Sequence, residues 1–109
     1  MNFNHKEIKQ FHIIETTGRL DVTHAPLFEK EVQKYIDDGH KELIIDMNGV
    51  DYISSAGLRS ILISAKAIKK VQGEIRFCNL TEIVDEVFTI SGFKSMFKIF
   101  DSVAAATDD

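Results

Sequence analysis

The sequence predicts an α/β fold, with a single mixed sheet of four to five strands and alternating helices packed mainly on one face. Residues 1–109 suit a single domain, because this length is close to the commonest domain size and 44% of the residues are hydrophobic. Short apolar runs alternate with longer segments whose apolar residues recur at helical spacing. The run at 74–78 follows the helical segment at 55–71 after a short connection, which is typical of a parallel strand–helix–strand unit.

Strands are expected where apolar residues alternate or form short runs. Residues 2–8 alternate weakly, as in an edge strand, and residues 42–47 form the nearly continuous apolar run of a central strand. Segment 17–21 is expected to leave the sheet after the second strand. The complete set of expected strands is 2–8, 11–16, 42–47, 74–78 and 97–100.

Three helices are expected between these strands. The first begins after Thr23, holds Pro26 in its first turn and ends at Gly39. The second spans residues 55–71, and the third is capped by Thr81. The expected apolar faces are, in chain order, Phe28, Val32, Tyr35 and Ile36; Leu58, Ile61, Leu62, Ala65 and Ile68; and Ile83, Val87, Phe88 and Ile90.

Two serines, Ser54 and Ser55, lie where a loop is expected to turn into the helix at 55–71. A serine hydroxyl at this position accepts a hydrogen bond from a first-turn amide, so one of the two serves as a cap. The N-terminal end of a helix carries free N–H groups and a partial positive charge, and therefore accommodates a phosphate. The other hydroxyl is a candidate for phosphorylation that leaves the fold intact.

Two aspartates are expected near these serines. Asp21 follows the second expected strand, and Asp46 is expected to end the third strand just before the serine loop. If the two strands are neighbours, both carboxylates approach the same end of the sheet as Ser55 and form a small acidic rim around its hydroxyl. The alternative is that each aspartate only caps a loop, as this residue type commonly does.

Common enzyme motifs are absent from the sequence. It contains neither glycine pattern of nucleotide-binding loops, nor the G-x-S-x-G motif of serine hydrolases. Its four histidines show no paired metal spacing, so we expect surface histidines, no bound metal and no cofactor. Cys78 is expected to be a buried, unreactive thiol. An enzyme with Ser55 as nucleophile and a histidine as base stays open as an alternative. The histidines are His5, His12, His24 and His40.

Charge and hydropathy bear on partners and location. The formal net charge of −4 argues against nucleic acid as a direct partner, because phosphate backbones select basic surfaces. No apolar run approaches the ~20 residues that a membrane span needs, so we expect no membrane insertion. With a single cysteine and a polar first stretch, a reducing cytoplasm is the expected location.

The sequence ISSAGL at 53–58 resembles the signature loop of STAS domains, in particular of bacterial anti-sigma-factor antagonists. The similarity extends over essentially the whole chain, so the expected sheet and helices are those of a STAS-like domain. Further segments resemble, in the family's order, its turn after the second strand, the strand before its phosphorylation loop, and its closing helix and strand. These segments are TGRLD at 17–21, LIIDM at 43–47, and FTISGF at 88–93 followed by FKIF at 97–100.

The resemblance implies a binding protein that switches partners, and not an enzyme. In the family, an unmodified antagonist binds an anti-sigma factor that is also a serine kinase, and this binding frees a sigma factor. The kinase phosphorylates one serine, the antagonist is released, and a metal-dependent serine phosphatase restores it. The family's acceptor position matches Ser55, and acidic positions near it match Asp21 and Asp46.

The resemblance also places other residues around Ser55 at the phosphorylation site and the partner contact. Many family members have Asp in place of Ser54, and Ser or Thr in place of Ala56. The second difference removes a rival acceptor and favours Ser55, with Ser54 as the alternative. A second STAS role stays open, a constitutive scaffold subunit of a lipid-transport or stress-signalling assembly, in which Ser55 is only a cap. The surrounding residues are Ser54, Ala56, Gly57, Leu58 and Arg59.

Overall fold

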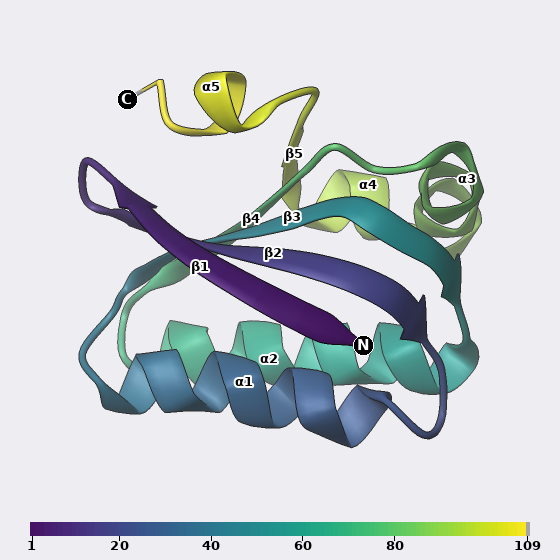
Figure 1. The fold of residues 1–109 in the computed structure, drawn as a ribbon, viewed down its shortest axis with the longest axis horizontal. Helices are drawn as coiled ribbons and strands as arrows, with labels where there is room; N and C mark the ends of the chain where they lie inside the picture. Colours follow the sequence, from purple (N-terminus) through teal and green to yellow (C-terminus); the bar gives the residue numbers. More distant parts are fainter. Residues whose placement is uncertain (109) are drawn as a thin grey trace.

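The computed structural model describes residues 1–108 and contains one five-stranded sheet, with strand order β1-β2-β3-β4-β5 (Figure 1). β1 runs antiparallel to β2, and the other neighbouring strands are parallel. The mixed sheet predicted from the sequence is therefore confirmed. The strands are β1 (Asn2–Ile8), β2 (Phe11–Leu20), β3 (Glu42–Ile53), β4 (Glu74–Cys78) and β5 (Lys98–Phe100).

Helices connect the parallel strands. α1 follows β2, α2 follows β3, α3 and α4 lie between β4 and β5, and α5 follows β5. Within the described residues, no helix has the length and apolar character that crossing a bilayer requires. The helices are α1 (Ala25–Asp37), α2 (Ser55–Lys70), α3 (Glu82–Ser91), α4 (Phe93–Met96) and α5 (Val103–Ala106).

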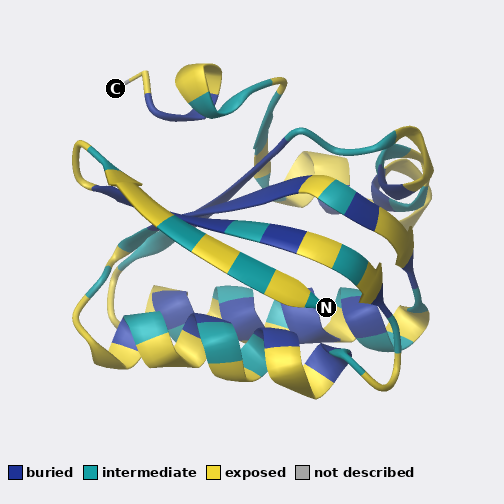
Figure 2. Ribbon diagram, viewed as in Figure 1, coloured by how far each residue is buried: buried dark blue, intermediate teal, exposed yellow. Residues whose placement is uncertain are grey.

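The two faces of the sheet are covered unequally. α1 and α2 lie side by side beneath one face, whereas the short α5 lies against the other (Figure 1). Ile45 of β3 belongs to the main core together with Phe28 of α1, while Ile44 belongs to a smaller core that contains Ala106 of α5. Buried residues recur along α1 and α2 and through the centre of the sheet (Figure 2). The prediction that helices pack mainly on one face is confirmed.

β2 and β3 extend further than their apolar runs predict. Segment 17–21 was expected to leave the sheet, but β2 continues to Leu20 and pairs there with Ile53, the last residue of β3. Irregularities in the register mark this extension, and a Cβ on Gly49 would lie 2.3 Å from Thr17 Cγ2. The parallel pairing therefore continues through polar residues and glycine, which interrupt the apolar pattern but leave the backbone hydrogen bonds available.

The first turn of α1 is organised by an aspartate. α1 begins at Ala25, with His24 instead of the expected Thr23 at the N-cap position, and Pro26 lies in the first turn as predicted. The backbone N–H of His24 donates to the Asp21 carboxylate at 3.1 Å, and the N–H of Ala25 donates to the Asp21 carbonyl at 2.8 Å. Asp21 thus accepts hydrogen bonds from both backbone amides at the start of α1, without a capping threonine.

The predicted apolar face of α3 was partly wrong. Phe88 is buried as expected, and Val84 is buried beside it, but Ile83 and Ile90 are exposed by 52% and 87%. Val84 and Phe88 are four residues apart and so share one helical face, and the ring of Phe88 packs edge-on against Phe77, with 5.6 Å between centroids. Packing on this aromatic group of the core sets the rotation of the short helix.

Thr81 holds the N-cap position of α3, as predicted, but its hydroxyl caps no helix amide. It donates instead to the carbonyl of Val50 at 2.8 Å, which joins the start of α3 to the final part of β3. Gly92 ends α3 in the left-handed conformation with φ 83°, and α4 begins immediately after it.

Candidate functional site

The two serines before α2 have different structural roles. Ser54 is the N-cap residue with an extended backbone, and its Oγ accepts a hydrogen bond from the N–H of Gly57 at 3.1 Å. The backbone N–H of Ser54 donates to the carbonyl of Leu20 at 3.0 Å, which fixes the cap against the end of β2. Ser55 is the first helical residue and is exposed. The cap is therefore complete without Ser55.

The Ser55 hydroxyl lies at the positively polarised end of a 16-residue helix. Within residues 1–108, this hydroxyl makes no hydrogen bond, and the backbone N–H groups of Ser55 and Ala56 have no acceptor. The first turn contains no acidic side chain, while Lys69 and Lys70 occupy the last turn. An anion attached at Ser55 would meet free amides and a favourable dipole.

Gly57 brings the start of α2 close to the sheet. A Cβ at this position would lie 2.3 Å from the carbonyl oxygen of Leu20 and 3.0 Å from Ile53 Cγ1. No side chain fits there, so Gly57 permits the contact that holds Ser54 and Ser55 at the ends of β2 and β3. Its neighbour Leu58 is partly buried and packs against the main core, whereas Arg59 is exposed.

Asp21 lies at the same end of the sheet as Ser55. It follows Leu20, the residue whose carbonyl accepts the Ser54 N–H, and its Oδ1 is 2.7 Å from His24 Nδ1. Partial desolvation alone would raise the pKa of Asp21. Hydrogen bonds from the backbone and ring of His24, with the charges of His24 and Arg19, hold the pKa below its usual value. Asp21 is therefore an ionised rim residue that also organises the start of α1.

Asp46 does not lie where the sequence placed it. It was expected to end its strand beside Ser55, but it lies in the middle of β3, paired with Glu15 and Cys78. Its strand neighbours face the main core, so its carboxylate points to the opposite face of the sheet, where Oδ1 accepts from Asn48 and Asn79. Ile53 lies seven residues after Asp46, which corresponds to about 23 Å along the strand.

Sequence reasoning missed an ordered pair beside the serine. Arg19 and Tyr52 are register partners at the ends of β2 and β3, and the Arg19 guanidinium lies 4.1 Å from the Tyr52 ring centroid. Arg19 Nε is also 3.6 Å from Asp21 Oδ2. Nearby, Val22 in the loop after β2 is exposed by 73%, and Leu27 in the first turn of α1 is exposed by 46%. The sequence could have predicted this pairing only if the ends of β2 and β3 had been placed correctly.

The expectation of surface histidines was wrong for His12, whereas His5, His24 and His40 are partly exposed. His12 is only 5% exposed, and its ring stacks on Tyr35 at 4.1 Å between centroids. His5 and His40 lie beside it, with ring centroids 5.3 and 4.4 Å from that of His12. Burial, followed by the charges of His40 and His5, lowers the pKa of His12. Strand pairing brings these distant positions together, which no sequence spacing indicates.

The surroundings of Cys78 and of Ser55 determine whether either side chain can act as a nucleophile. Cys78 is fully buried, and burial together with the charge of Asp46 raises the pKa of its thiol to about 12. His24 is the histidine paired with Asp21, yet within residues 1–108 no hydrogen bond joins a histidine to the Ser55 hydroxyl. The thiol is therefore poorly reactive, and the three groups of a serine hydrolase are not connected.

The mixed sheet and the serine-bearing start of α2 define an α/β domain of the STAS type. The family model of the STAS domain matches residues 2–106, and the chain belongs to this family. BtrV of Bordetella bronchiseptica, whose name assigns it provisionally to the anti-sigma factor antagonists, is 43% identical over 89 residues, which are 82% of this chain and 77% of BtrV. The anti-sigma-B factor antagonist of Staphylococcus aureus is 25% identical over 101 residues, covering 91% of this chain and 94% of the relative.

Solved structures with the same fold are also described as anti-sigma factor antagonists. A protein from Thermotoga maritima superposes with a TM-score of 0.86 at 22% identity, covering 97% of this chain and 92% of that one. SpoIIAA in its unphosphorylated form gives a TM-score of 0.81 at 19% identity, covering 98% and 94%. SpoIIAA of Bacillus in its phosphorylated form gives 0.74 at 18% identity, covering 98% and 97%. These likenesses establish the fold, and the names of the relatives are those of regulators.

Proposed function

We propose that this protein is an anti-sigma-factor antagonist that acts by partner switching. Its unphosphorylated form binds an anti-sigma factor with serine kinase activity and thereby frees a sigma factor. Phosphorylation of Ser55 releases the complex, and a metal-dependent serine phosphatase restores the binding form. The observation on which the proposal rests is that Ser54 caps α2, while the Ser55 hydroxyl is exposed and unbonded within residues 1–108.

The physical basis of the switch is that a phosphate affects the fold and the complex differently. A phosphoserine carries roughly −1.5 to −2 charges at neutral pH. At Ser55 this charge would be stabilised by the first-turn amides and the dipole of α2. Against an apolar or acidic partner surface, the same charge is repelled and costly to desolvate. The domain therefore keeps its structure while the complex dissociates.

The surface around Ser55 has the residue composition of a protein-binding surface. Val22, Leu27 and Tyr52 are exposed apolar residues at this end of the sheet, and Arg59 lies one helical turn beyond Ser55. Apolar and aromatic residues with arginine are enriched where proteins bind one another. Asp21 adds a fixed negative charge to this surface. Asp46 is not part of the proposed contact, because it lies on the far face in the middle of β3.

The proposal is tested with the anti-sigma factor kinase purified from the native host. Incubation with this kinase and ATP, followed by peptide mass spectrometry, is expected to place one phosphate on Ser55. Ser55→Ala abolishes the modification, whereas Ser95→Ala, which changes an exposed serine of α4, leaves it intact. Ser55→Asp is expected to weaken kinase binding by about 3 kcal/mol, on the order of a hundredfold. Unmodified Ser55, or unchanged binding by Ser55→Asp, contradicts the proposal.

The constitutive scaffold remains the second candidate, because apolar residues are also exposed away from Ser55. Ile63 of α2 and Ile90 of α3 are exposed by 42% and 87%. A partner held through these residues would be insensitive to Ser55→Asp and would copurify as a stable assembly. Recovery of a transporter ATPase, and not of a kinase, would favour this role.

Catalysis by Ser55 is the third candidate, and the Asp21–His24 pair is the feature that favours it. A fluorophosphonate probe labels an activated serine, so labelling lost in both Ser55→Ala and His24→Gln would support an enzyme. We expect no labelling, because Ser55 lacks a hydrogen-bonded base within residues 1–108.

A further inference from the structure

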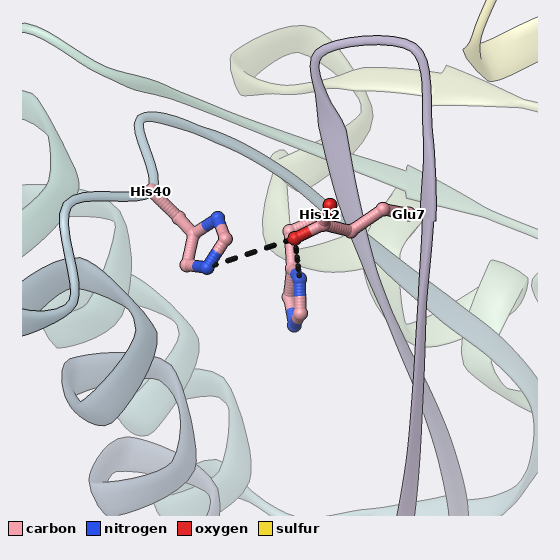
Figure 3. A group of neighbouring side chains, drawn as sticks. All are labelled: Glu7, His12 and His40. Carbon is pink, nitrogen blue, oxygen red and sulfur yellow. Dashed lines mark ion pairs between the residues drawn. The ribbon is translucent and has the colours of Figure 1, made fainter.

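Glu7, His12 and His40 lie close together (Figure 3). Their strand positions place them at the end of the sheet opposite to Ser55. Glu7 is near the end of β1, His12 is near the start of β2, and His40 precedes β3. One potential ligand atom from each residue lies within 4.8 Å of the others. Glu7 Oε1 is 3.7 Å from His12 Nδ1 and 3.9 Å from His40 Nε2. Three separate segments thus direct metal-binding atoms to one point.

His12 supplies an independent indication of a ligand. Its side chain is 6% exposed, and its Nδ1 is a buried atom that has no hydrogen-bond partner in the described residues. Buried polar atoms are almost always satisfied, because an unpaired one keeps the full penalty of desolvation. This unpaired nitrogen faces the Glu7 carboxylate, which also approaches the His40 ring (Figure 3).

A chain of hydrogen bonds determines which form of the His12 ring is present. His12 Nε2 is 3.2 Å from His5 Nδ1, and His5 Nε2 is hydrogen-bonded to the Glu31 carboxylate. Since a carboxylate accepts, a neutral His5 donates from Nε2 and accepts at Nδ1, so His12 donates from its Nε2. The lone pair of His12 is then left on Nδ1, toward the Glu7 carboxylate. In metal sites the second ring N–H of a ligating imidazole is commonly held by a hydrogen-bond acceptor, and His5 Nδ1 is that acceptor for His12.

We propose that Glu7, His12 and His40 bind a divalent transition-metal cation of the zinc class, with the fourth position open to water. Two imidazoles and one carboxylate suit Zn²⁺ and its neighbours, whereas Mg²⁺ and Ca²⁺ prefer oxygen ligands throughout. A tetrahedral zinc site with bonds of about 2.0 Å places its ligand atoms roughly 3.3 Å apart. The two separations to Glu7 therefore need to contract by only a few tenths of an ångström.

The two outer ligands are partly exposed, which leaves their side chains room for this contraction. Glu7 has a side chain that is 65% exposed, and His40, at 29%, lies on the loop between α1 and β3. His12 is held by its neighbours and acts as the fixed ligand. A bound cation would join the β1–β2 hairpin to the α1–β3 loop, and it would stabilise the folded state by an amount that rises with the logarithm of the free cation concentration above the dissociation constant. This site is independent of Ser55 and of the proposed partner switch.

The test uses full-length protein without an affinity tag, stripped of metal with a chelator. Isothermal titration with Zn²⁺ is expected to give one equivalent of binding, and Mg²⁺ is expected to give none. At a hundredfold excess over the dissociation constant, zinc should raise Tm by roughly 10 °C. His40→Ala and Glu7→Gln should each weaken zinc binding at least tenfold. His24→Gln, which removes the histidine outside the cluster, should leave zinc affinity unchanged.

Spectroscopy on the unmutated protein avoids any variant that misfolds. In ¹⁵N-resolved NMR of the histidine rings, zinc is expected to shift His12 Nδ1 and His40 Nε2, while His24 stays unaffected. Co²⁺ in place of zinc should give the visible absorption of a four-coordinate site. The proposal is overturned if zinc binds only in the millimolar range, if His24→Gln loses as much affinity as His40→Ala, or if the His12 resonances do not move.

Discussion

The hydroxyl of Ser54 accepts the amide hydrogen of Gly57 at 3.1 Å, so the residue before the exposed serine closes the first turn of α2. Ser54 also donates its backbone N–H to Leu20 at the end of β2. Two adjacent residues of the same type therefore have separate tasks, one structural and one available for modification. This separation can be measured as a difference in stability between two alanine variants.

Ser54→Ala should destabilise the domain, whereas Ser55→Ala should have little effect. Loss of a serine N-cap typically costs about 1 kcal/mol, because the Gly57 amide loses its acceptor. Ser55 makes no hydrogen bond through its hydroxyl within residues 1–108, and its replacement should stay within about 0.5 kcal/mol. Urea unfolding at neutral pH measures both values. Equal destabilisation by the two variants would contradict the assignment of the cap.

Gly57→Ala should destabilise the protein, although this change usually stabilises a helix. In an exposed helix interior, Gly→Ala is favourable by roughly 0.5–1 kcal/mol. Here the added Cβ would lie 2.3 Å from the backbone oxygen of Leu20, so the start of α2 must move away from β2. We expect a loss of about 1–3 kcal/mol, as in other overpacked sites. An unchanged or higher urea midpoint would disprove the close contact.

The sequence was sufficient to predict the sheet, the order of its strands along the chain and the exposed position of Ser55. The strands β2 to β5 each have a recognisable apolar run, β1 alternates weakly, and Ser54–Ser55 precedes a strong helical pattern. It was insufficient for the ends of β2 and β3. Their final pairs, including Arg19 with Tyr52, depend on backbone hydrogen bonds between neighbouring strands and not on apolar side chains. Asp46 was placed at the end of its strand because the apolar run does not show that β3 continues to Ile53.

The grouping of Glu7, His12 and His40 could not be predicted from the sequence for a different reason. Glu7 and His12 face each other because the β1–β2 hairpin pairs them, and His40 joins them because β3 starts beside β2. These contacts arise from sheet topology, so a search for short metal-binding spacings could not find them. The exposed Ile90 of α3 has a similar origin, since tertiary packing decides which side of a short amphipathic helix is buried.

Cys78 should react slowly with alkylating reagents while the protein is folded. Its thiol pKa is raised from 9.0 to about 12, so the folded protein holds about a thousandfold less thiolate than the unfolded chain at neutral pH. Iodoacetamide labelling followed by intact-mass measurement should be very slow in buffer and fast in denaturing urea. The unfolded sample serves as the control for reagent activity. Similar rates in the two conditions would show that the thiol is accessible.

Asp21 should contribute to the loss of stability in acid. Its pKa in the folded protein is lowered, so the carboxylate stabilises the native state above its unfolded pKa near 3.8. This contribution disappears as the pH falls through the lower folded pKa. Asp21→Asn should therefore unfold at lower urea than the parent at pH 6, and the gap should narrow toward pH 3. A gap that stays constant with pH would indicate lost hydrogen bonds without a lost charge.

The charge of the residue at position 55 should change stability with a definite sign. Ser55→Asp is expected to be as stable as Ser55→Ala or more stable, by about 0.3–1 kcal/mol at low salt, because it places a negative charge at the positive end of α2. Ser55→Lys should be less stable by a similar amount.

Both differences should shrink as salt is added, since the Debye length falls to about 3 Å at 1 M. Urea unfolding of the three variants at low and high salt provides the measurement, and Ser95→Asp on α4 serves as an exposed control away from the start of α2. If Ser55→Asp proves strongly destabilising, the start of α2 does not tolerate an anion. A phosphate at Ser55 would then disrupt the domain itself, and release of a partner would follow from unfolding and not from repulsion at an intact surface.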